Sequence, residues 1–216
     1  MSSPPPLIPG VYYHIFNRGN NREVVFREER NYFYFLTLYA KYIGPVADTL
    51  AYCLMSNHFH FLLRLLTEEE QKQWAITNEA LEDTDPELND WQPKSPSRQF
   101  SHFFNAYAKA FNKMYGRTGS LFEHPFGRIP VTSDSYLRNL VVYIHQNPRK
   151  HAFADDFRTW PFSSYRAILS DQPTKVNRAH VLGWFDHSRE RFAASHDVMH
   201  ASMPILPAMW DKFRDL

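Results

Sequence analysis

The feature that most constrains the fold is a pair of apolar segments separated by only two polar residues. The segments "TLAYCLM" (residues 49–55) and "HFHFLLRLL" (residues 58–66) flank the dipeptide "SN". Each has a length typical of a strand, and a two-residue connection suits a tight hairpin. The sequence therefore predicts two neighbouring antiparallel strands.

The second segment carries two histidines, His58 and His60. Because side chains alternate between the faces of a strand, the two imidazoles would share one face, roughly 7 Å apart, with Phe59 and Phe61 on the other face. This spacing suits a metal ion, although two histidines on a strand are also ordinary polar residues of a half-solvated sheet. A metal site would need a further ligand and a reacting group from elsewhere in the chain.

Strand and helix signals surround the hairpin. "VYYHIFNRGNN" (residues 11–21) predicts a first strand that runs into a turn, and residues 28–42 have apolar side chains at helical spacing. Residues 98–119 predict another amphipathic helix. "SLFEHPFGRIPV" (residues 120–131) is extended, and its two prolines restrict it to an edge strand or a loop.

A further helix is predicted in "TSDSYLRNLVVYIHQNPRK" (residues 132–150). Ser133 or Asp134 can cap its start, and Pro148 is expected to end it at about Asn147. Beyond about residue 166 the chain predicts short helices, and their expected anchors are aromatic: Trp184, Phe185 and Trp210.

Composition fits a soluble globular protein. The chain has 216 residues, 44% of them hydrophobic and one of them cysteine, Cys53, which excludes an internal disulfide framework and fits a reducing cytoplasm. No apolar run approaches the roughly 20 residues of a membrane helix. We therefore expect a cytoplasmic protein with no membrane association.

Charge is unevenly distributed, although the net charge is only +1. Residues 68–90 contain nine acidic side chains and one basic one, whereas residues 94–128 contain six basic side chains and one acidic one. The acidic stretch belongs to a polar, proline-containing region, residues 66–97, that predicts an insertion. The basic stretch permits a polyanionic partner such as nucleic acid.

Five pieces of the sequence, in this order, resemble the HUH single-tyrosine transposases, particularly the REP-associated tyrosine transposases and their insertion-sequence relatives. They are "YHIFNRGNNREVVF", "YCLMSNHFHFLL", "GRTGSLFEHPF", "YLRNLVVYIHQNPRKH" and "WPFSSY". The resemblance spans about residues 9–165. It implies a ferredoxin-like (RRM-like) α+β domain over residues 1–165, an antiparallel sheet with helices packed on one face, followed by a helical extension over residues 166–216.

The resemblance also implies roles for individual residues. His58 and His60 would be paired metal ligands, Tyr143 the nucleophile, and Asn147 a polar third ligand one helical turn further on. The metal would be a divalent cation, Mg²⁺ or Mn²⁺. A partial cage of this kind leaves coordination positions for phosphate oxygens and water.

Neighbouring residues leave alternatives open. Gln146 or His145 could replace Asn147 as the third ligand if the helix turns differently, and His14 is either a neighbour of the site or a core histidine. Tyr136 shares a helical stripe with Tyr143 and is expected to be a packing residue.

The implied activity is nicking and rejoining of single-stranded DNA through a 5′-phosphotyrosine, by a protein that is a monomer or a homodimer. The partner would be single-stranded DNA with hairpin or palindromic structure. Six basic residues are candidate phosphate contacts: Arg18, Arg22, Lys109, Lys113, Arg117 and Arg128.

Two other functions remain open. A replication-initiator or relaxase nuclease uses the same histidine pair, with its tyrosine in another context. A non-enzymatic RNA-recognition module shares the sheet topology and stacks bases on exposed aromatic side chains.

Overall fold

A computed structural model describes residues 4–78 and 90–198 of the chain. Its elements are β1 (Tyr12–Arg18), η1 (Asn20–Arg22), α1 (Glu29–Ile43), β2 (Ala47–Leu54), β3 (His58–Leu65), α2 (Glu68–Asn78), α3 (Pro96–Tyr115), β4 (Gly127–Val131), α4 (Asp134–Lys150), η3 (Phe157–Thr159), α5 (Tyr165–Leu169), α6 (Arg178–Gly183) and α7 (Arg189–Val198). None of the described helices combines the length and the apolar character needed to cross a membrane.

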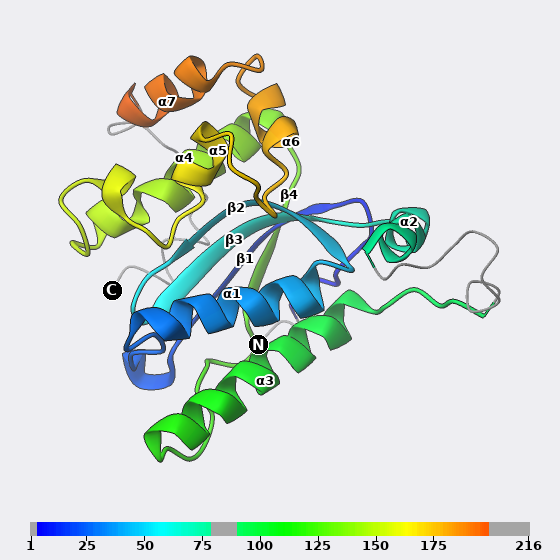
Figure 1. Cartoon of the computed structure of the whole chain (residues 1–216), viewed down its shortest axis with the longest axis vertical. Coiled ribbons are helices and arrows are strands. Elements are labelled where there is room, and N and C mark those ends of the chain that lie inside the picture. Colours follow the sequence, from blue (N-terminus) through cyan, green and yellow to red (C-terminus); the bar gives the residue numbers. More distant parts are fainter. Residues whose placement is uncertain (1–3, 79–89, 199–216) are drawn as a thin grey trace.

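The four strands form one antiparallel sheet in the order β2-β3-β1-β4 (Figure 1). With α1 between β1 and β2 and α3 between β3 and β4, the connectivity is that of a ferredoxin-like fold. The predicted hairpin forms between β2 and β3, and the two-proline segment provides β4 at the edge of the sheet. The predicted α+β class and antiparallel sheet are confirmed.

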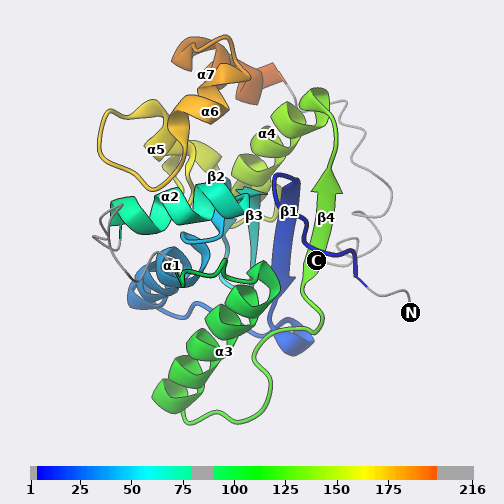
Figure 2. The ribbon, with the colours of Figure 1, turned by 90° about the vertical axis from the view of Figure 1, so that its right-hand side faces the viewer.

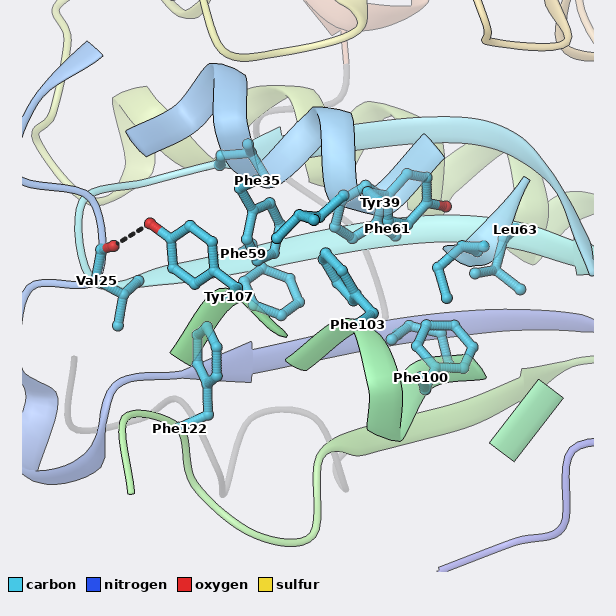
Figure 3. Packing of buried hydrophobic residues seen from close by; sticks show 14 of the residues in the cluster. Val25, Phe35, Tyr39, Phe59, Phe61, Leu63, Phe100, Phe103, Tyr107 and Phe122 are labelled. Atoms are coloured by element: carbon cyan, nitrogen blue, oxygen red, sulfur yellow. Dashed lines mark hydrogen bonds between the residues drawn. The ribbon is translucent and has the colours of Figure 1, made fainter. Parts of the chain in front are cut away.

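Helices α1 and α3 cover one face of the sheet (Figures 1 and 2). The core on this side is largely aromatic and includes Phe35, Phe59, Phe61, Phe103 and Tyr107 (Figure 3). Burying each phenylalanine ring stabilises the fold by roughly 1.5–3 kcal/mol. Alternation along β3 therefore directs its phenylalanines to this core and its histidines to the opposite face.

Helix α4 covers the opposite face, so helices pack on both sides of the sheet and not on one side as predicted. Val141 and Ile144 of α4 share a buried apolar cluster with Leu62 of β3 and Cys53 of β2. The short helices α5, α6 and α7 complete this layer around α4 (Figure 1). Bases therefore have no bare sheet face to stack on within the described residues.

Helix α4 begins as predicted, because the Ser133 side chain accepts a hydrogen bond from the Tyr136 backbone N–H. The predicted end was wrong, since the helix continues through Pro148 to Lys150. Proline removes a hydrogen bond to the carbonyl four residues earlier. The carbonyl that loses its donor is that of Ile144, and Asn147 Nδ2 replaces that donor weakly, at 3.5 Å, while making a stronger hydrogen bond to the Tyr143 carbonyl at 2.8 Å.

Within the polar region predicted as an insertion, residues 66–97, α2 occupies residues 68–78 and buries Gln71 and Ala75. Residues 79–89 lie outside the described part of the chain. The expected short helices after residue 166 are present, with Phe185 buried and Trp184 packed on the same cluster. Trp210 lies outside the described residues.

Candidate active site

His58 and His60 project from β3 toward α4, and both side chains are buried. Their ring centroids are 5.4 Å apart with planes at 87°. The strand alternation expected from the sequence is therefore present. The two imidazoles converge in the space between the sheet and α4.

Each of the two imidazoles is oriented by a hydrogen bond at Nδ1. His58 Nδ1 donates to Asn57 Oδ1 at 2.7 Å, and His60 Nδ1 is hydrogen-bonded to His14 Nε2 at 2.9 Å. Metal-ligating histidines commonly have such a partner at the second ring nitrogen. His14, on the neighbouring strand β1, is thus a neighbour of the site, and Nε2 is the atom of each β3 histidine that can act as a ligand.

Burial keeps these histidines neutral at physiological pH. It lowers the pKa of His14 and of His58 to about 3, with His151 and Arg18 adding to the effect at His58. It also places the pKa of His60 well below its ordinary value. The neutral imidazole is the form that binds a metal ion.

Tyr143 of α4 lies against the same histidines. Its ring centroid is 5.7 Å from that of His60 and 6.3 Å from that of His14, both edge-on. The side chain is 7% exposed, and burial raises its pKa to about 12, although the nearby Asn147 side chain acts in the opposite direction. The phenol is therefore neutral in the folded protein and needs a cation nearby to lose its proton.

Asn147 lies on α4 one turn after Tyr143, which contacts His60, and one turn before His151, whose ring lies 5.1 Å from that of His58. Its Nδ2 is held by the carbonyl of Tyr143, while Oδ1 is buried with no hydrogen-bond partner among the described residues. A buried polar atom without a partner is costly unless a ligand completes it. An amide oxygen is a suitable ligand for a divalent cation.

The two alternatives to Asn147 point elsewhere. His145 is hydrogen-bonded through Nδ1 to His196 Nε2 at 2.9 Å and through Nε2 to Ser164 Oγ at 2.8 Å. Gln146 Nε2 donates to the His196 carbonyl at 2.7 Å. Both side chains are committed to the layer formed by α5 and α7, which leaves Asn147 as the remaining candidate for the third ligand.

The donor set of His58, His60 and Asn147 consists of two neutral imidazoles and one amide oxygen, which fits a divalent cation that keeps open positions. No group of three or more His, Cys, Asp or Glu side chains is arranged to hold a metal ion in the described part of the chain. The predicted site therefore depends on the amide as its third protein ligand.

No family model matches the chain. A Haemophilus influenzae protein named "Putative REP-associated tyrosine transposase" is 27% identical over 118 residues, which are 55% of this chain and 58% of that protein. The solved structure titled "Structure of the REP associates tyrosine transposase bound to a REP hairpin" has a TM-score of 0.55 and 17% identity, and covers 80% of this chain and 88% of that one. The chain is similar to the REP-associated tyrosine transposases.

The resemblance predicted from the five motifs is thereby confirmed. The sequence match spans somewhat more than half of the curated transposase's length. The structural match, at 17% identity, shows that the two chains share a fold. Roles of individual residues depend on the geometry of this chain alone.

Two residues near the candidate active site were not expected from the sequence. Lys150 places Nζ 4.9 Å from the centroid of the Tyr143 ring, and the His151 ring lies 5.1 Å from that of His58. Lys150 is seven residues after Tyr143, so the helical periodicity that selected Asn147 could also have selected Lys150. Tyr136 is partly buried against the apolar cluster below α4, as expected of a packing residue.

The six basic residues predicted to contact the DNA of such a transposase are divided between two regions. Arg18 lies opposite His58 in the β1–β3 register and forms an ion pair with Glu123. Arg22 is exposed in η1. These two side chains lie near the end of β1, at the same end of the sheet as His58.

The other four basic residues lie on the side of the sheet that α3 covers. Lys109 and Lys113 are exposed on α3, and Arg128 stacks on the Phe126 ring at 4.8 Å. Arg117 is bound to Glu23 at 2.6 Å and to the Ser120 carbonyl at 3.0 Å, so its guanidinium stabilises the loop that follows α3. DNA contact by these residues stays a prediction.

Proposed function

We propose that the chain is a metal-dependent transposase-type enzyme that nicks single-stranded DNA through Tyr143 and rejoins strands. The observation that carries the proposal is the position of Tyr143, whose ring lies edge-on to His60 with Asn147 one helical turn away. A tyrosine lies against neutral imidazoles, and the next turn of the same helix carries a buried amide oxygen without a hydrogen-bond partner among the described residues. This arrangement supports phosphoryl transfer better than a structural role.

The proposed reaction is a transesterification. Tyr143 Oη attacks the scissile phosphorus, the bond to the 3′ oxygen breaks, and the phenol proton passes to solvent as the 3′ oxygen takes up a proton. The product is a 5′-phosphotyrosine and a free 3′-hydroxyl. Attack by a 3′-hydroxyl on this linkage reverses the step and rejoins the strands without an external energy source.

His58, His60 and Asn147 would hold the divalent cation, Mg²⁺ or Mn²⁺. When bound, such a cation supplies positive charge to phosphate oxygens and favours the phenolate. His14 and Asn57 would fix the ring orientations of the ligands through their hydrogen bonds. These partners leave Nε2 of each ligand directed at the site.

Lys150 supports the same chemistry. Its ammonium lies 4.9 Å from the centre of the Tyr143 ring, and a cation at this position is attracted to the ring and would favour the phenolate. The same group can bind a non-bridging phosphate oxygen once the strand is in place. We therefore propose that Lys150 stabilises the negative charge of the transition state in the proposed cleavage.

The proposed partner is single-stranded DNA with hairpin structure. The solved transposase with this fold is described as bound to a REP hairpin. An enzyme with such a substrate would work in the cytoplasm, at the nucleoid. A relaxase or replication initiator would share the nicking step, so the rejoining of two different strands is the property that separates it from a transposase.

A non-enzymatic RNA-recognition module is less well supported. Such modules stack bases on an exposed sheet face. Here α1 and α3 cover one face and α4 covers the other. The aromatic side chains of this sheet are buried in the two hydrophobic cores or packed against them.

The test is cleavage of labelled oligonucleotides that contain a hairpin and single-stranded flanks, with Mg²⁺ or Mn²⁺ and with EDTA. We expect nicking that requires the cation and that is lost when His58 and His60 are both replaced by alanine. The exposed His102→Ala is the matched control and should nick normally. Undiminished nicking in EDTA, or in the double variant, would overturn the metal-dependent assignment.

A further inference from the structure

A cavity of about 320 Å³ lies on the α3 side of the sheet, away from the candidate active site. Its walls are one side of α3, the segment of residues 119–126, and Asn17 of β1. Residues 116–126 form one of the five motifs that carry the resemblance, yet the proposed cleavage uses none of them. This segment therefore forms a wall of the cavity and takes no part in the proposed cleavage.

Hydrogen bonds hold the cavity open in one shape. Asn112 Nδ2 donates to the Gly119 carbonyl at 2.9 Å, and Asn17 Nδ2 donates to the Glu123 carbonyl at 3.1 Å. The Arg117 guanidinium donates to the Ser120 carbonyl. The loop wall is thus tied to both α3 and β1, and a ligand would enter a largely preformed site.

The lining combines two kinds of surface. Phe104 and Phe126 provide partly exposed rings whose centroids are 5.2 Å apart, and Arg128 lies over the Phe126 ring. Asn105 and Lys109 are exposed and have no hydrogen-bond or ion-pair partner among the described residues. Aromatic rings, an uncommitted amide and an uncommitted ammonium are the groups that bind a base face, a base edge and a phosphate respectively.

The local charge favours an anion. Among the described residues that line the cavity, the one carboxylate belongs to Glu123, and Arg18 neutralises it in an ion pair. Lys109 is left as an unpaired positive charge at the cavity. A phosphate group would therefore meet attraction and little opposing charge.

The cavity and the candidate active site lie at the same end of the central strand pair. Asn17 lines the cavity, and its neighbour Arg18 is directly opposite His58 in the β1–β3 register. Successive side chains of a strand point to opposite faces, so Asn17 serves the α3 side and His58 the α4 side. A flexible strand that passes the end of β1 could occupy both places.

We propose that this cavity binds one unpaired nucleotide of the same DNA strand that is cleaved at Tyr143. The base lies against Phe104 and Phe126, Asn105 contacts its edge, and Lys109 contacts a phosphate. The identity of the strand rests on the proposed function, whereas the nucleotide pocket itself does not require cleavage. Occupation of the pocket would fix which phosphate reaches the active site.

The test uses a series of fluorescent hairpin oligonucleotides in which one flanking nucleotide at a time is abasic, with binding measured by anisotropy in EDTA. We expect one position, or two adjacent ones, at which loss of the base weakens wild-type binding about tenfold, the effect of losing one stacked base. Asn105→Ala and Ala108→Trp, which fills the cavity, should weaken binding of the intact oligonucleotide and show no further loss at that position.

Ser101→Ala, at an exposed position one turn before Asn105 and outside the cavity, is the matched control and should keep the wild-type profile. Thermal unfolding verifies that Ala108→Trp is folded, and the exposed Asn105→Ala tests the proposal if it is not. The proposal is overturned if no flanking base matters, or if one matters equally in wild type and in both cavity variants.

Nicking of the same oligonucleotides with Mg²⁺ separates this proposal from the proposed function. Nicking without dependence on the cavity would refute the pocket alone. Cavity-dependent binding without nicking would refute the cleavage activity and leave the pocket intact.

Discussion

Asn147 Nδ2 donates a hydrogen bond to the backbone carbonyl of Tyr143, one turn earlier on α4, at 2.8 Å. This bond fixes the amide so that Oδ1, and not the NH₂ group, is left for a ligand. The same side chain compensates for the hydrogen bond that Pro148 removes from the helix. One residue thus keeps the helix intact beyond the nucleophile and supplies the third candidate ligand.

Replacing Asn147 tests this double role. Asn147→Ala should weaken binding of Mn²⁺ by at least about tenfold, because one of three protein ligands is lost. Asn147→Asp keeps an oxygen ligand but buries a charge, so the metal-free protein should be less stable than wild type and recover when Mn²⁺ is added. Thermal unfolding with and without Mn²⁺ measures both effects. Equal metal-induced stabilisation of Asn147→Ala and wild type would remove Asn147 from the ligand set.

Tyr143→Phe should abolish the covalent adduct while leaving DNA binding within a factor of about two, because only the hydroxyl is removed. Peptide mass analysis of trapped product should place the 5′-phosphotyrosine on Tyr143. Tyr136→Phe is the matched control, since Tyr136 is a partly buried tyrosine on the same helix. An adduct on Tyr136, or one that persists in Tyr143→Phe, would show that the nucleophile was wrongly assigned.

His14 should behave as a partner of the metal site and not as an ordinary core residue. His14→Ala removes the hydrogen bond to His60 Nδ1, and loss of such a partner typically weakens metal affinity by about 10- to 100-fold. Calorimetric titration with Mn²⁺ measures the change. His180→Ala, which removes a histidine hydrogen-bonded to Tyr12 elsewhere in the fold, is the control. A loss of stability with unchanged metal affinity would restrict His14 to the core.

The free energy of unfolding should decrease as the pH falls from about 6.5 to about 4, because buried His196 stays neutral in the folded protein over this range. Burial lowers the pKa of His196 to about 4, and the groups that face it are His145 of α4, Arg158 of η3, and Tyr165 and Asp197. The unfolded chain takes up this proton near pH 6.5, whereas the folded chain does so only near pH 4. Above about pH 6.5, His196 is neutral in both states and does not lower the free energy of unfolding. As the pH falls from about 6.5 toward 4, the unfolded chain gains a proton that the folded chain refuses, and the free energy of unfolding decreases by up to about 3 kcal/mol.

Denaturant unfolding of wild type and His196→Gln across this range isolates the contribution of His196. The variant should lose less stability than wild type between neutral and acidic pH, because the other buried histidines remain in both proteins. Parallel curves for the two proteins would contradict the expected effect of His196.

Lys109 and Lys113 should account for part of the salt dependence of DNA binding. Each lysine that touches a single-stranded phosphate contributes about 0.7 to the slope of log affinity against log salt, so Lys109→Ala with Lys113→Ala should reduce the slope by up to about 1.4. Anisotropy across a salt series measures it. Lys72→Ala, exposed on the acidic helix α2, is the control. An unchanged slope would place the DNA track nearer Arg18 and Arg22.

Local patterns in the sequence determined much of this protein. Alternation along β3 was enough to put His58 and His60 on one face, and helical periodicity was enough to put Tyr143 and Asn147 on one stripe. The hairpin, the edge strand with its prolines and the similarity to REP-associated tyrosine transposases were likewise predictable. Each of these depends on residues that are close together in the chain or on short motifs.

Only the tertiary structure decided where these stripes meet. The rotation of α4 about its axis turns Tyr143 toward His60 and His145 toward α7. It depends on the apolar surface of Val141 and Ile144 fitting the sheet face that α1 and α3 leave free. The tertiary structure also shows that α4 continues through Pro148 and that the basic side chains lie on two sides of the sheet. Periodicity specifies which residues share a face, but long-range packing specifies what that face touches.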